Sequence, residues 1–215
     1  GCAARMAAGR ALPFAIGHKT PSGYGAPAMN FHTVSIGRGL LAISELPGLR
    51  GNYTADLKAI RDWAPGLVVS LTTQTEMDEA GSADLGAHLA ERGSRWVHLP
   101  ITDFGIPTEP VLTRWPEVSS KARAALAGGG RVLFHCRGGC GRSGMAALRV
   151  MIEAGEAPDA ALTRLRAVRT CAVETDAQLA WAKAAIQGTD VFVRKPAAII
   201  TRRASDDKAA TDKAG

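Results

Sequence analysis

The sequence predicts an α/β domain in which a central, mostly parallel sheet is flanked by helices. Two short apolar runs, Leu67–Leu71 and Arg131–His135, have the length and composition of buried strands. They alternate along the chain with longer segments in which apolar residues recur at helical spacing. Such alternation is typical of a parallel sheet with helices on both faces. The length of 215 residues suits one domain of this kind with additional ends.

The first predicted element is a hairpin over Val34–Leu46, with Gly37–Gly39 in its turn. A short helix is expected over Asp56–Trp63, because Leu57 and Ile60 fall on one side of it. The first of the two apolar runs follows as a strand. These elements predict that the amino-terminal part of the domain begins with strand pairing and then alternates helix with strand.

A helical stretch after that strand is expected to bend or break near Gly81 and Gly86 and to end at Gly93. The next strand is predicted over Trp96–Leu99, again as a short apolar run. The loop after this strand is bounded by prolines and a glycine. A loop is therefore expected there.

A further helix is expected over Val111–Ala127, with an interruption near Pro116, because proline lacks the N–H group that a helix uses. The strand Arg131–His135 then follows a run of three glycines. The remaining predicted helices cover residues 143–153, 158–168 and 176–187. The last of the strands is thus predicted to lead directly into a helical carboxyl-terminal half.

The two ends differ in composition from the rest of the chain. Residues 1–32 are rich in Gly, Pro and Ala and predict a loosely ordered lead-in, residues 33–190 the domain, and residues 191–215 a flexible tail. No apolar run reaches the roughly 18 residues that a membrane-spanning helix needs, and no secretory signal is recognised. The four cysteines lack a framework spacing, so we expect free thiols and a cytoplasmic protein.

The positive net charge of the chain indicates which kinds of molecule it could bind. The chain carries a formal charge of +6 and has a sequence pI near 9.5, which favours anionic partners such as phosphoester substrates, nucleic acid or anionic lipid. The basic residues are spread along the chain and no nucleic-acid reader motif accompanies them. Specific nucleic-acid binding is therefore not predicted.

A glycine-rich loop joins the strand Arg131–His135 to the following helix. Its residues are Cys136, Arg137, Gly138, Gly139, Cys140, Gly141, Arg142 and Ser143. Glycines allow the backbone N–H groups to point inward around an anion, and the start of the helix adds its positive dipole end. The guanidinium of Arg142 can bind two oxygens of one phosphate. Residues 137–142 are thus predicted to bind phosphate, and the same field favours the thiolate of Cys136, the form that attacks phosphorus.

The motif His135-Cys136-x5-Arg142-Ser143, followed by Gly144, resembles that of the protein tyrosine phosphatase superfamily. The resemblance implies a phosphomonoester hydrolase that works through a phosphocysteine intermediate, with Cys136 as the nucleophile and with no metal or cofactor. It also implies that residues 33–190 are the phosphatase domain.

Within that superfamily the chain looks closest to the dual-specificity branch, and there to the cyclin-dependent kinase inhibitor-3-type, or kinase-associated, phosphatases. Three segments support this resemblance: Gly138-Gly139, Leu46-Pro47-Gly48 and Pro100-Ile101-Thr102-Asp103. The resemblance covers roughly residues 34–187. It implies a phosphorylated protein or peptide as substrate and identifies no protein partner.

Phosphomonoester cleavage also needs a proton donor for the leaving oxygen. By resemblance this is an aspartate on a mobile loop upstream of the cysteine, and Asp103 lies in the loop after the strand Trp96–Leu99. Asp103 is therefore expected to act as general acid and then as general base. The alternative is a loop aspartate that caps the following helix. Asp78 and Asp84 fall in predicted helical stretches and are poorer candidates for the acid.

The loop neighbours each have a functional and a structural interpretation. By resemblance, Ser143 hydrogen-bonds the sulfur of the nucleophile, whereas its structural alternative is to cap the helix. By resemblance, His135 orders the loop, which differs little from a satisfied histidine at a strand end. Arg137 is expected to face anionic groups beside the phosphate or simply solvent. Phe104 and Ile106 are expected to shield the site or to contribute to packing.

Downstream of the loop, Glu174 and Gln178 are candidates for positioning the hydrolytic water. Related phosphatases often show Gln where this chain has Glu174, and Thr175-x-x-Gln178 is also a capping-box pattern, so helix capping is an alternative for Gln178. Cys140 or Cys171 is a candidate resolving cysteine that would trap an oxidised nucleophile as a disulfide.

Three classes of function remain open from the sequence. The first is a tyrosine or dual-specificity protein phosphatase, and the second a phosphatase for phosphoinositide or another non-protein phosphate. The third is a non-catalytic phosphopeptide-binding module. A rhodanese-type sulfur-transferase does not need the upstream acid, and low-molecular-weight tyrosine phosphatases place loop and acid in the opposite order.

Overall fold

The computed structural model describes residues 29–186. The tail predicted over 191–215 and most of the lead-in predicted over 1–32 lie outside the described residues. The remainder of that lead-in packs on the domain: the backbone N–H of Met29 donates to Asp56 Oδ1 at 3.1 Å, and the ring of Phe31 stacks on Trp63 at 5.2 Å between centroids. The described part of the chain therefore includes residues ahead of the predicted boundary at 33.

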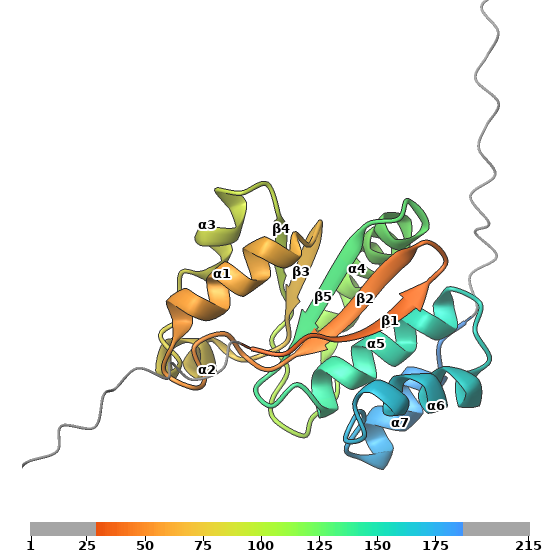
Figure 1. Cartoon of the computed structure of the whole chain (residues 1–215). Coiled ribbons are helices and arrows are strands. Elements are labelled where there is room, and N and C mark those ends of the chain that lie inside the picture. The colour runs from red at the N-terminus through yellow and green to blue at the C-terminus, as the bar shows by residue number, and fades with distance from the viewer. Residues whose placement is uncertain (1–28, 187–215) are drawn as a thin grey trace, which may run out of the picture.

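A five-stranded sheet forms the centre of the domain, in the strand order β1-β2-β5-β3-β4 (Figure 1). Its strands are β1 His32–Ile36, β2 Gly39–Ser44, β3 Leu67–Ser70, β4 Arg95–His98 and β5 Arg131–His135. Only the β1–β2 hairpin is antiparallel, and every other pairing is parallel. The predicted mostly parallel α/β sheet is confirmed.

Helices cover both faces of this sheet. Their bounds are α1 Tyr53–Trp63, α2 Gln74–Glu79, α3 Leu85–Ala90, α4 Glu109–Ala127, α5 Gly141–Glu153, α6 Pro158–Val168 and α7 Asp176–Lys183. The alternation of strand side chains separates two cores: Leu41 and Ile43 of β2 face the helices α4–α7, whereas Ala42 faces α1–α3. Figure 1 shows the two groups of helices on opposite sides of the sheet.

The predicted break near Gly86 is wrong, whereas the break near Gly81 is confirmed. Gly81 has φ +67° in the turn between α2 and α3, a conformation that suits glycine. Gly86 lies inside α3, where a Cβ would come within 2.3 Å of the Trp96 ring. Gly86 is thus used for close packing of helix on strand.

Two predictions about helices also fail. Pro116 does not interrupt α4, which runs through it. Its missing N–H leaves the carbonyl of Leu112 without its helical partner, and Leu112 lies on the exposed side, where water can satisfy that oxygen. The last helix ends at Lys183, short of the predicted residue 187. None of the helices described here is both long and apolar enough to cross a membrane.

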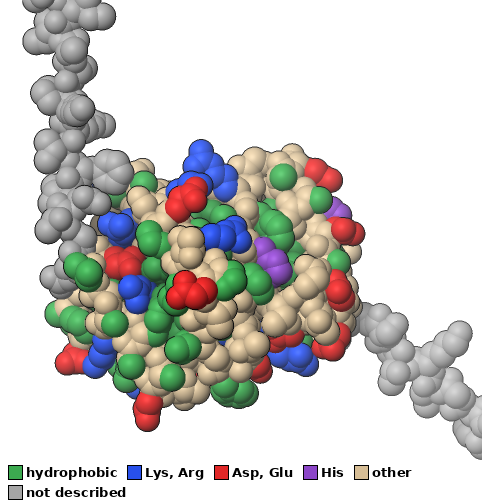
Figure 2. Space-filling view, turned by 180° about the vertical axis from the view of Figure 1, so that it is seen from behind, with side chains coloured by type: hydrophobic (Ala, Val, Ile, Leu, Met, Phe, Trp, Pro, Cys, Tyr) green, Lys and Arg blue, Asp and Glu red, His purple; other side chains and the backbone are tan. Residues whose placement is uncertain are grey.

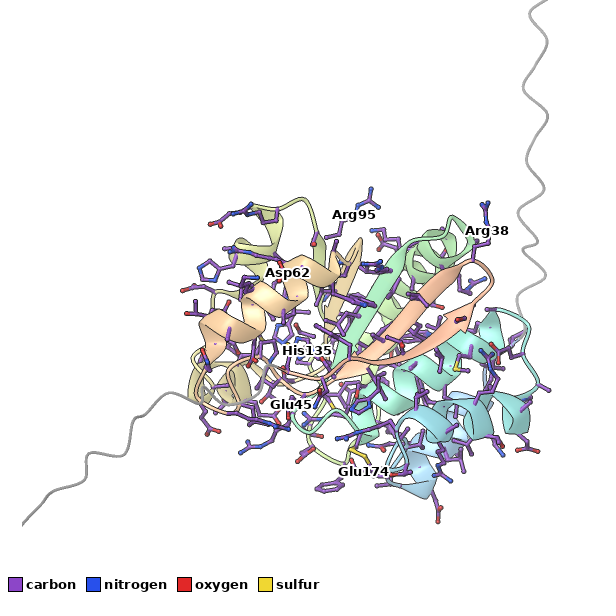
Figure 3. All side chains as sticks on the ribbon, viewed as in Figure 1. Arg38, Glu45, Asp62, Arg95, His135 and Glu174 are labelled. Carbon is purple, nitrogen blue, oxygen red and sulfur yellow. A yellow bond between two sulfur atoms is a disulfide. The ribbon has the colours of Figure 1, made fainter. Side chains whose placement is uncertain are left out.

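The parallel strands place four chain segments at one edge of the sheet. The carboxyl ends of β2, β3, β4 and β5 all lie there, and the loops that leave them are neighbours. Figure 3 shows Glu45, His135 and Glu174 toward this edge, and Arg38 and Arg95 at the opposite end of the sheet. On the face seen in Figure 2, acidic and basic side chains are intermixed.

Candidate active site

The anion loop, residues 136–142, links β5 to α5. Cys136 at its start is buried, and its Sγ lies 3.2 Å from Ser143 Oγ. Helix α5 begins at Gly141 with Cys140 in the N-cap position, so the alternative that Ser143 caps the helix is wrong. Ser143 lies instead in the first turn, where its hydroxyl faces the sulfur.

Groups outside the anion loop hold its carbonyls. Arg169 donates from Nε to the carbonyl of Gly139 at 3.2 Å and from Nη2 to that of Gly138 at 2.9 Å. The backbone N–H of Leu46 donates to the carbonyl of Arg137 at 3.1 Å. The carbonyls of residues 137–139 are therefore all bonded to groups outside the loop, which fixes the course of its backbone.

Gly139 is the glycine that the anion loop most needs. It has φ +67°, and a Cβ on it would lie 2.5 Å from the carbonyl carbon of Ser44 at the end of β2. At Gly138, by contrast, a Cβ would meet nothing within 4 Å. The loop therefore curls against β2 only because position 139 lacks a side chain.

Arg142 is 1% exposed, and its guanidinium lies at the centre of the site. It donates to both carboxylate oxygens of Glu76 at 2.7 and 2.8 Å, to the carbonyl of Ile101 at 2.9 Å and to Asp103 Oδ1 at 2.8 Å. Its Nε is buried and has no hydrogen-bond partner among the described residues. A buried donor without a partner is costly, so an acceptor such as a phosphate oxygen fits here.

Glu76 is a site residue that the sequence analysis missed. Its carboxylate accepts from Arg142 and from the backbone N–H of Thr73, with which it forms a capping box at the start of α2. Burial alone raises the pKa of a carboxyl, but the bonds from Arg142 and Thr73 outweigh it and lower the pKa of Glu76 to about 2. Burial alone would lower the pKa of Arg142, but the hydrogen bonds and negative charge of Glu76 outweigh burial and raise it. The sequence pattern Thr73-x-x-Glu76 is that of a capping box, but such a pattern predicts only where a helix begins and not a contact with Arg142.

Asp103 lies in the acid loop, residues 99–108, between β4 and α4. Its side chain is half exposed, and Oδ1 accepts from Arg142 and from the backbone N–H of Phe104 at 3.2 Å. The alternative that Asp103 caps the following helix is wrong, because Thr108 is the N-cap of α4. Asp78 is exposed in α2, where Gln74 donates to it, and Asp84 is exposed at the start of α3.

Two apolar side chains of the acid loop face solvent. Phe104 is 60% exposed and Ile106 is 40% exposed. Phe104 also has φ +56°, a strained conformation for a residue with a Cβ. The packing alternative for this pair therefore does not hold in this structure, and both side chains are exposed on the loop that carries Asp103.

His135 is fully buried beneath the anion loop. Its Nε2 lies 2.6 Å from Ser70 Oγ, which in turn accepts from Trp96 Nε1 at 2.8 Å. Burial, followed by the nearby His98 and Arg142, lowers the pKa of His135 to about 3. The imidazole is therefore neutral, and its hydrogen bond with Ser70 joins the end of β5 to the end of β3.

Arg137 points away from the anion loop toward helix α2. It lies 3.5 Å from Glu79, and both side chains are largely exposed. Its backbone belongs to the loop, whereas its side chain stands at the rim.

Gln178 and Glu174 both approach the site. The buried Gln178 completes the predicted capping box with Thr175, which is confirmed. Its side-chain oxygen accepts from the backbone N–H of Glu174 at 3.0 Å, and its side-chain nitrogen donates to the carbonyl of Gly105 in the acid loop at 3.2 Å. A Cβ on Gly141 would lie 2.2 Å from Glu174 Oε2, so the carboxylate of Glu174 rests on the anion loop.

The expectation of free thiols is wrong for two cysteines. Cys140 and Cys171 form a disulfide, with their Cα atoms 5.3 Å apart, and Cys136 is the free cysteine among the described residues (Figure 3). The candidate resolving cysteines are therefore bonded to each other. The sequence separation of 31 residues carries no sign of this, because the pairing depends on how the segment after α6 folds back.

No protein-family model matches the chain, and no curated protein sequence matches it. Solved structures do. Kinase associated phosphatase, solved with its catalytic-site cysteine replaced by serine, is 20% identical with a TM-score of 0.64, over 72% of this chain and 92% of that one. Tk-PTP in its active form is 27% identical with a TM-score of 0.54, over 73% and 95%.

A third structure, PTPMT1 in complex with PI(5)P, is 20% identical with a TM-score of 0.55, over 70% of this chain and 92% of that one. The chain thus has the fold of the protein tyrosine phosphatases, and the resemblance to that superfamily and to kinase-associated phosphatase is confirmed. The general class of a cysteine-based phosphatase is supported by the same structures.

Proposed function

We propose that this protein is a tyrosine or dual-specificity protein phosphatase that works through a phosphocysteine intermediate. One observation carries the proposal: the buried Arg142, with a free Nε, joins the anion loop of Cys136 to the acid loop of Asp103. The loop and Arg142 bind the three equatorial oxygens of a phosphoryl group, and Asp103 stands on the side where a leaving group departs.

In the first step the thiolate of Cys136 attacks phosphorus. The bond between phosphorus and the ester oxygen breaks, and Asp103 gives its proton to that oxygen, so a neutral alcohol or phenol leaves. Arg142 and the inward N–H groups stabilise the charge of the transition state because they are already oriented. Phosphate binding also supplies the acceptor that Arg142 Nε lacks.

In the second step water attacks the phosphocysteine. Asp103 takes a proton from the water, the bond between phosphorus and sulfur breaks, and inorganic phosphate is released. The hydroxyl of Ser143, 3.2 Å from the sulfur, donates a hydrogen bond to the departing thiolate. Glu174, which rests on the anion loop, and Gln178, which donates to the carbonyl of Gly105 in the acid loop, hold the water.

The acid loop supports an aryl phosphate as substrate. Phe104 and Ile106 form an exposed apolar rim beside Asp103, which suits the ring of a phosphotyrosine better than a sugar or inositol. A phosphorylated protein or peptide is therefore the proposed substrate, and the cytoplasm is the proposed compartment. The cytoplasm also supplies dithiol reductants, to which the Cys140–Cys171 bond would be exposed.

Hydrolysis of an aryl phosphate in the presence of a chelator tests the proposal. We expect turnover in the wild type, its abolition in Cys136→Ser and a loss of about a hundredfold in kcat in Asp103→Ala. Asp84→Ala is the matched control, since it removes an exposed aspartate that does not contact Arg142.

The substrate class is tested with phosphotyrosine and phosphothreonine peptides against phosphoinositides in the same assay. A higher kcat/KM on phosphoinositide would replace the protein substrate with a lipid one. Binding of phosphopeptide without turnover on any of these compounds would make the protein a binding module.

A further inference from the structure

The disulfide joins the anion loop to the segment that carries the candidate water-positioning residues. Cys140 is the N-cap residue of α5, and Cys171 opens the 171–178 arm, the chain from the end of α6 into α7. A second, longer link is the hydrogen bond from the backbone N–H of Val173 to the carbonyl of Cys140 at 3.4 Å. The covalent bond is therefore the firm connection between loop and arm.

The arm is held in a strained conformation. Val173 has φ +67°, which a β-branched residue adopts only when its surroundings impose it. The approach is close: a Cβ on Gly144 of α5 would lie 2.7 Å from the nitrogen of Val173. Arg166 donates to the carbonyls of Ala172 and Val173, both at 3.1 Å, and ties the arm to α6.

The arm reaches both halves of the site. Glu174 rests on Gly141 of the anion loop, and the side-chain nitrogen of Gln178 bonds to Gly105, two residues after Asp103. The anion loop itself has separate supports, because Arg169 and Leu46 bond its carbonyls. Loss of the disulfide should thus displace the arm more than the loop.

We propose that the Cys140–Cys171 disulfide is a positioning device that holds the 171–178 arm for hydrolysis of the phosphocysteine, and that a dithiol reductant switches this step down. The proposal rests on the proposed function. Reduction breaks the S–S bond: two electrons and two protons from the dithiol convert both sulfurs to thiols, and the reductant becomes a disulfide. Cys136 is not part of this exchange. The released Val173 relaxes, and Glu174 and Gln178 no longer orient the water.

The test compares the oxidised full chain, the same protein reduced by dithiothreitol, and Cys140→Ser/Cys171→Ser. Alkylation with peptide mass mapping reports the state of each cysteine, and Cys136 must be alkylatable in all samples. We expect kcat on an aryl phosphate to fall about tenfold in the reduced and double-serine proteins, with a larger burst of phenol. The inhibition constant of inorganic phosphate should change less than twofold.

Two controls separate positioning from general damage. The double-serine protein should not respond to dithiothreitol. In a Gln178→Ala background, reduction should lower kcat no further, because the disulfide acts through this arm. Circular dichroism of the reduced wild type reports whether the fold persists if the double variant does not fold.

The outcomes are distinct. A kcat within twofold in oxidised and reduced protein overturns the proposal and leaves the phosphatase function standing. Equal losses in phosphate binding and kcat also overturn it, since the bond would then support the anion loop itself. An oxidised wild type that binds phosphate and hydrolyses nothing defeats the proposed function instead.

Discussion

Glu76 and Arg142 form a two-point ion pair across 66 residues of sequence, with Nη1 to Oε2 at 2.7 Å and Nη2 to Oε1 at 2.8 Å. The pair fixes the plane of the guanidinium and leaves the buried Nε without a hydrogen-bond partner among the described residues. The guanidinium of Arg142 is thus oriented in the ligand-free protein, before any substrate arrives. Asp103 in the acid loop accepts a further hydrogen bond from Nη2 of the same guanidinium.

The first prediction follows from this pair. In Glu76→Gln the new side chain can still take part in the capping box of α2. The variant loses the negative charge and one of the two oxygens that accept from Arg142, so the plane of the Arg142 guanidinium is no longer fixed. We expect the inhibition constant of inorganic phosphate to rise about tenfold, measured by competition against an aryl phosphate. Asp78→Asn on the exposed side of the same helix is the control and should leave that constant unchanged. Equal effects in both variants would contradict the orienting role of Glu76.

The second prediction concerns the two adjacent glycines of the anion loop. Gly139→Ala places a Cβ 2.5 Å from Ser44 at positive φ, whereas Gly138→Ala meets open space. We expect Gly139→Ala to lower the free energy of unfolding by at least about 2 kcal/mol and to abolish phosphate binding. Gly138→Ala should stay within about 0.5 kcal/mol of wild type. Urea unfolding and phosphate competition measure both, and a reversed order would refute the loop geometry.

The third prediction tests the apolar rim of the acid loop. Phe104→Ala removes an exposed ring beside Asp103 and should raise KM for an aryl phosphate about fivefold, a value typical of one aromatic contact. The inhibition constant of inorganic phosphate should not change, because that ion does not reach the rim. Leu112→Ala, an exposed apolar change in α4, is the control. An unaltered KM in Phe104→Ala would remove the argument for an aryl substrate.

The fourth prediction is a pH dependence of stability from His135. Burial lowers its pKa to about 3, from an ordinary value of 6.5. Between these values the unfolded chain binds a proton that the folded chain does not, so stability falls as pH drops below 6.5. The expected loss from this residue is about 2 kcal/mol between pH 7 and pH 5.

Urea unfolding of wild type and His135→Asn at pH 7 and pH 5 measures this effect. The variant should be less stable at pH 7 but should lose less stability on acidification than the wild type does. The same slope with pH in both proteins would show that His135 is not the residue that titrates.

The prediction of the fold from sequence succeeded where local pattern suffices. The strands are short apolar runs flanked by turn residues, so their positions follow from composition, and Arg131–His135 and Pro158–Val168 match their predicted bounds. The predicted helix breaks at Gly86 and Pro116 are wrong, because whether a glycine or proline interrupts a helix depends on the residues packed around it. A glycine under Trp96 is a contact, and a proline whose lost bond faces water is tolerated.

The anion loop was predictable because its parts are contiguous. Cys136, Arg142 and Ser143 lie within eight residues between a strand and a helix, and chain connectivity alone brings them together. Asp103 was expected from the resemblance to the superfamily, and its place after a parallel strand brings it to the same edge of the sheet, where it accepts from Arg142. By itself, the sequence thus determined the class of fold and which residues lie together in the anion loop, whose phosphate chemistry we propose.

Tertiary structure alone decided the contacts between distant segments. The clamp of Glu76 on Arg142, the disulfide of Cys140 with Cys171 and the bond of Gln178 to Gly105 each join residues more than 30 positions apart. No periodicity or spacing encodes such pairs, because they arise only when helices pack on the sheet and bring loop ends to the same edge. The orientation of Arg142 is therefore a property of the folded chain.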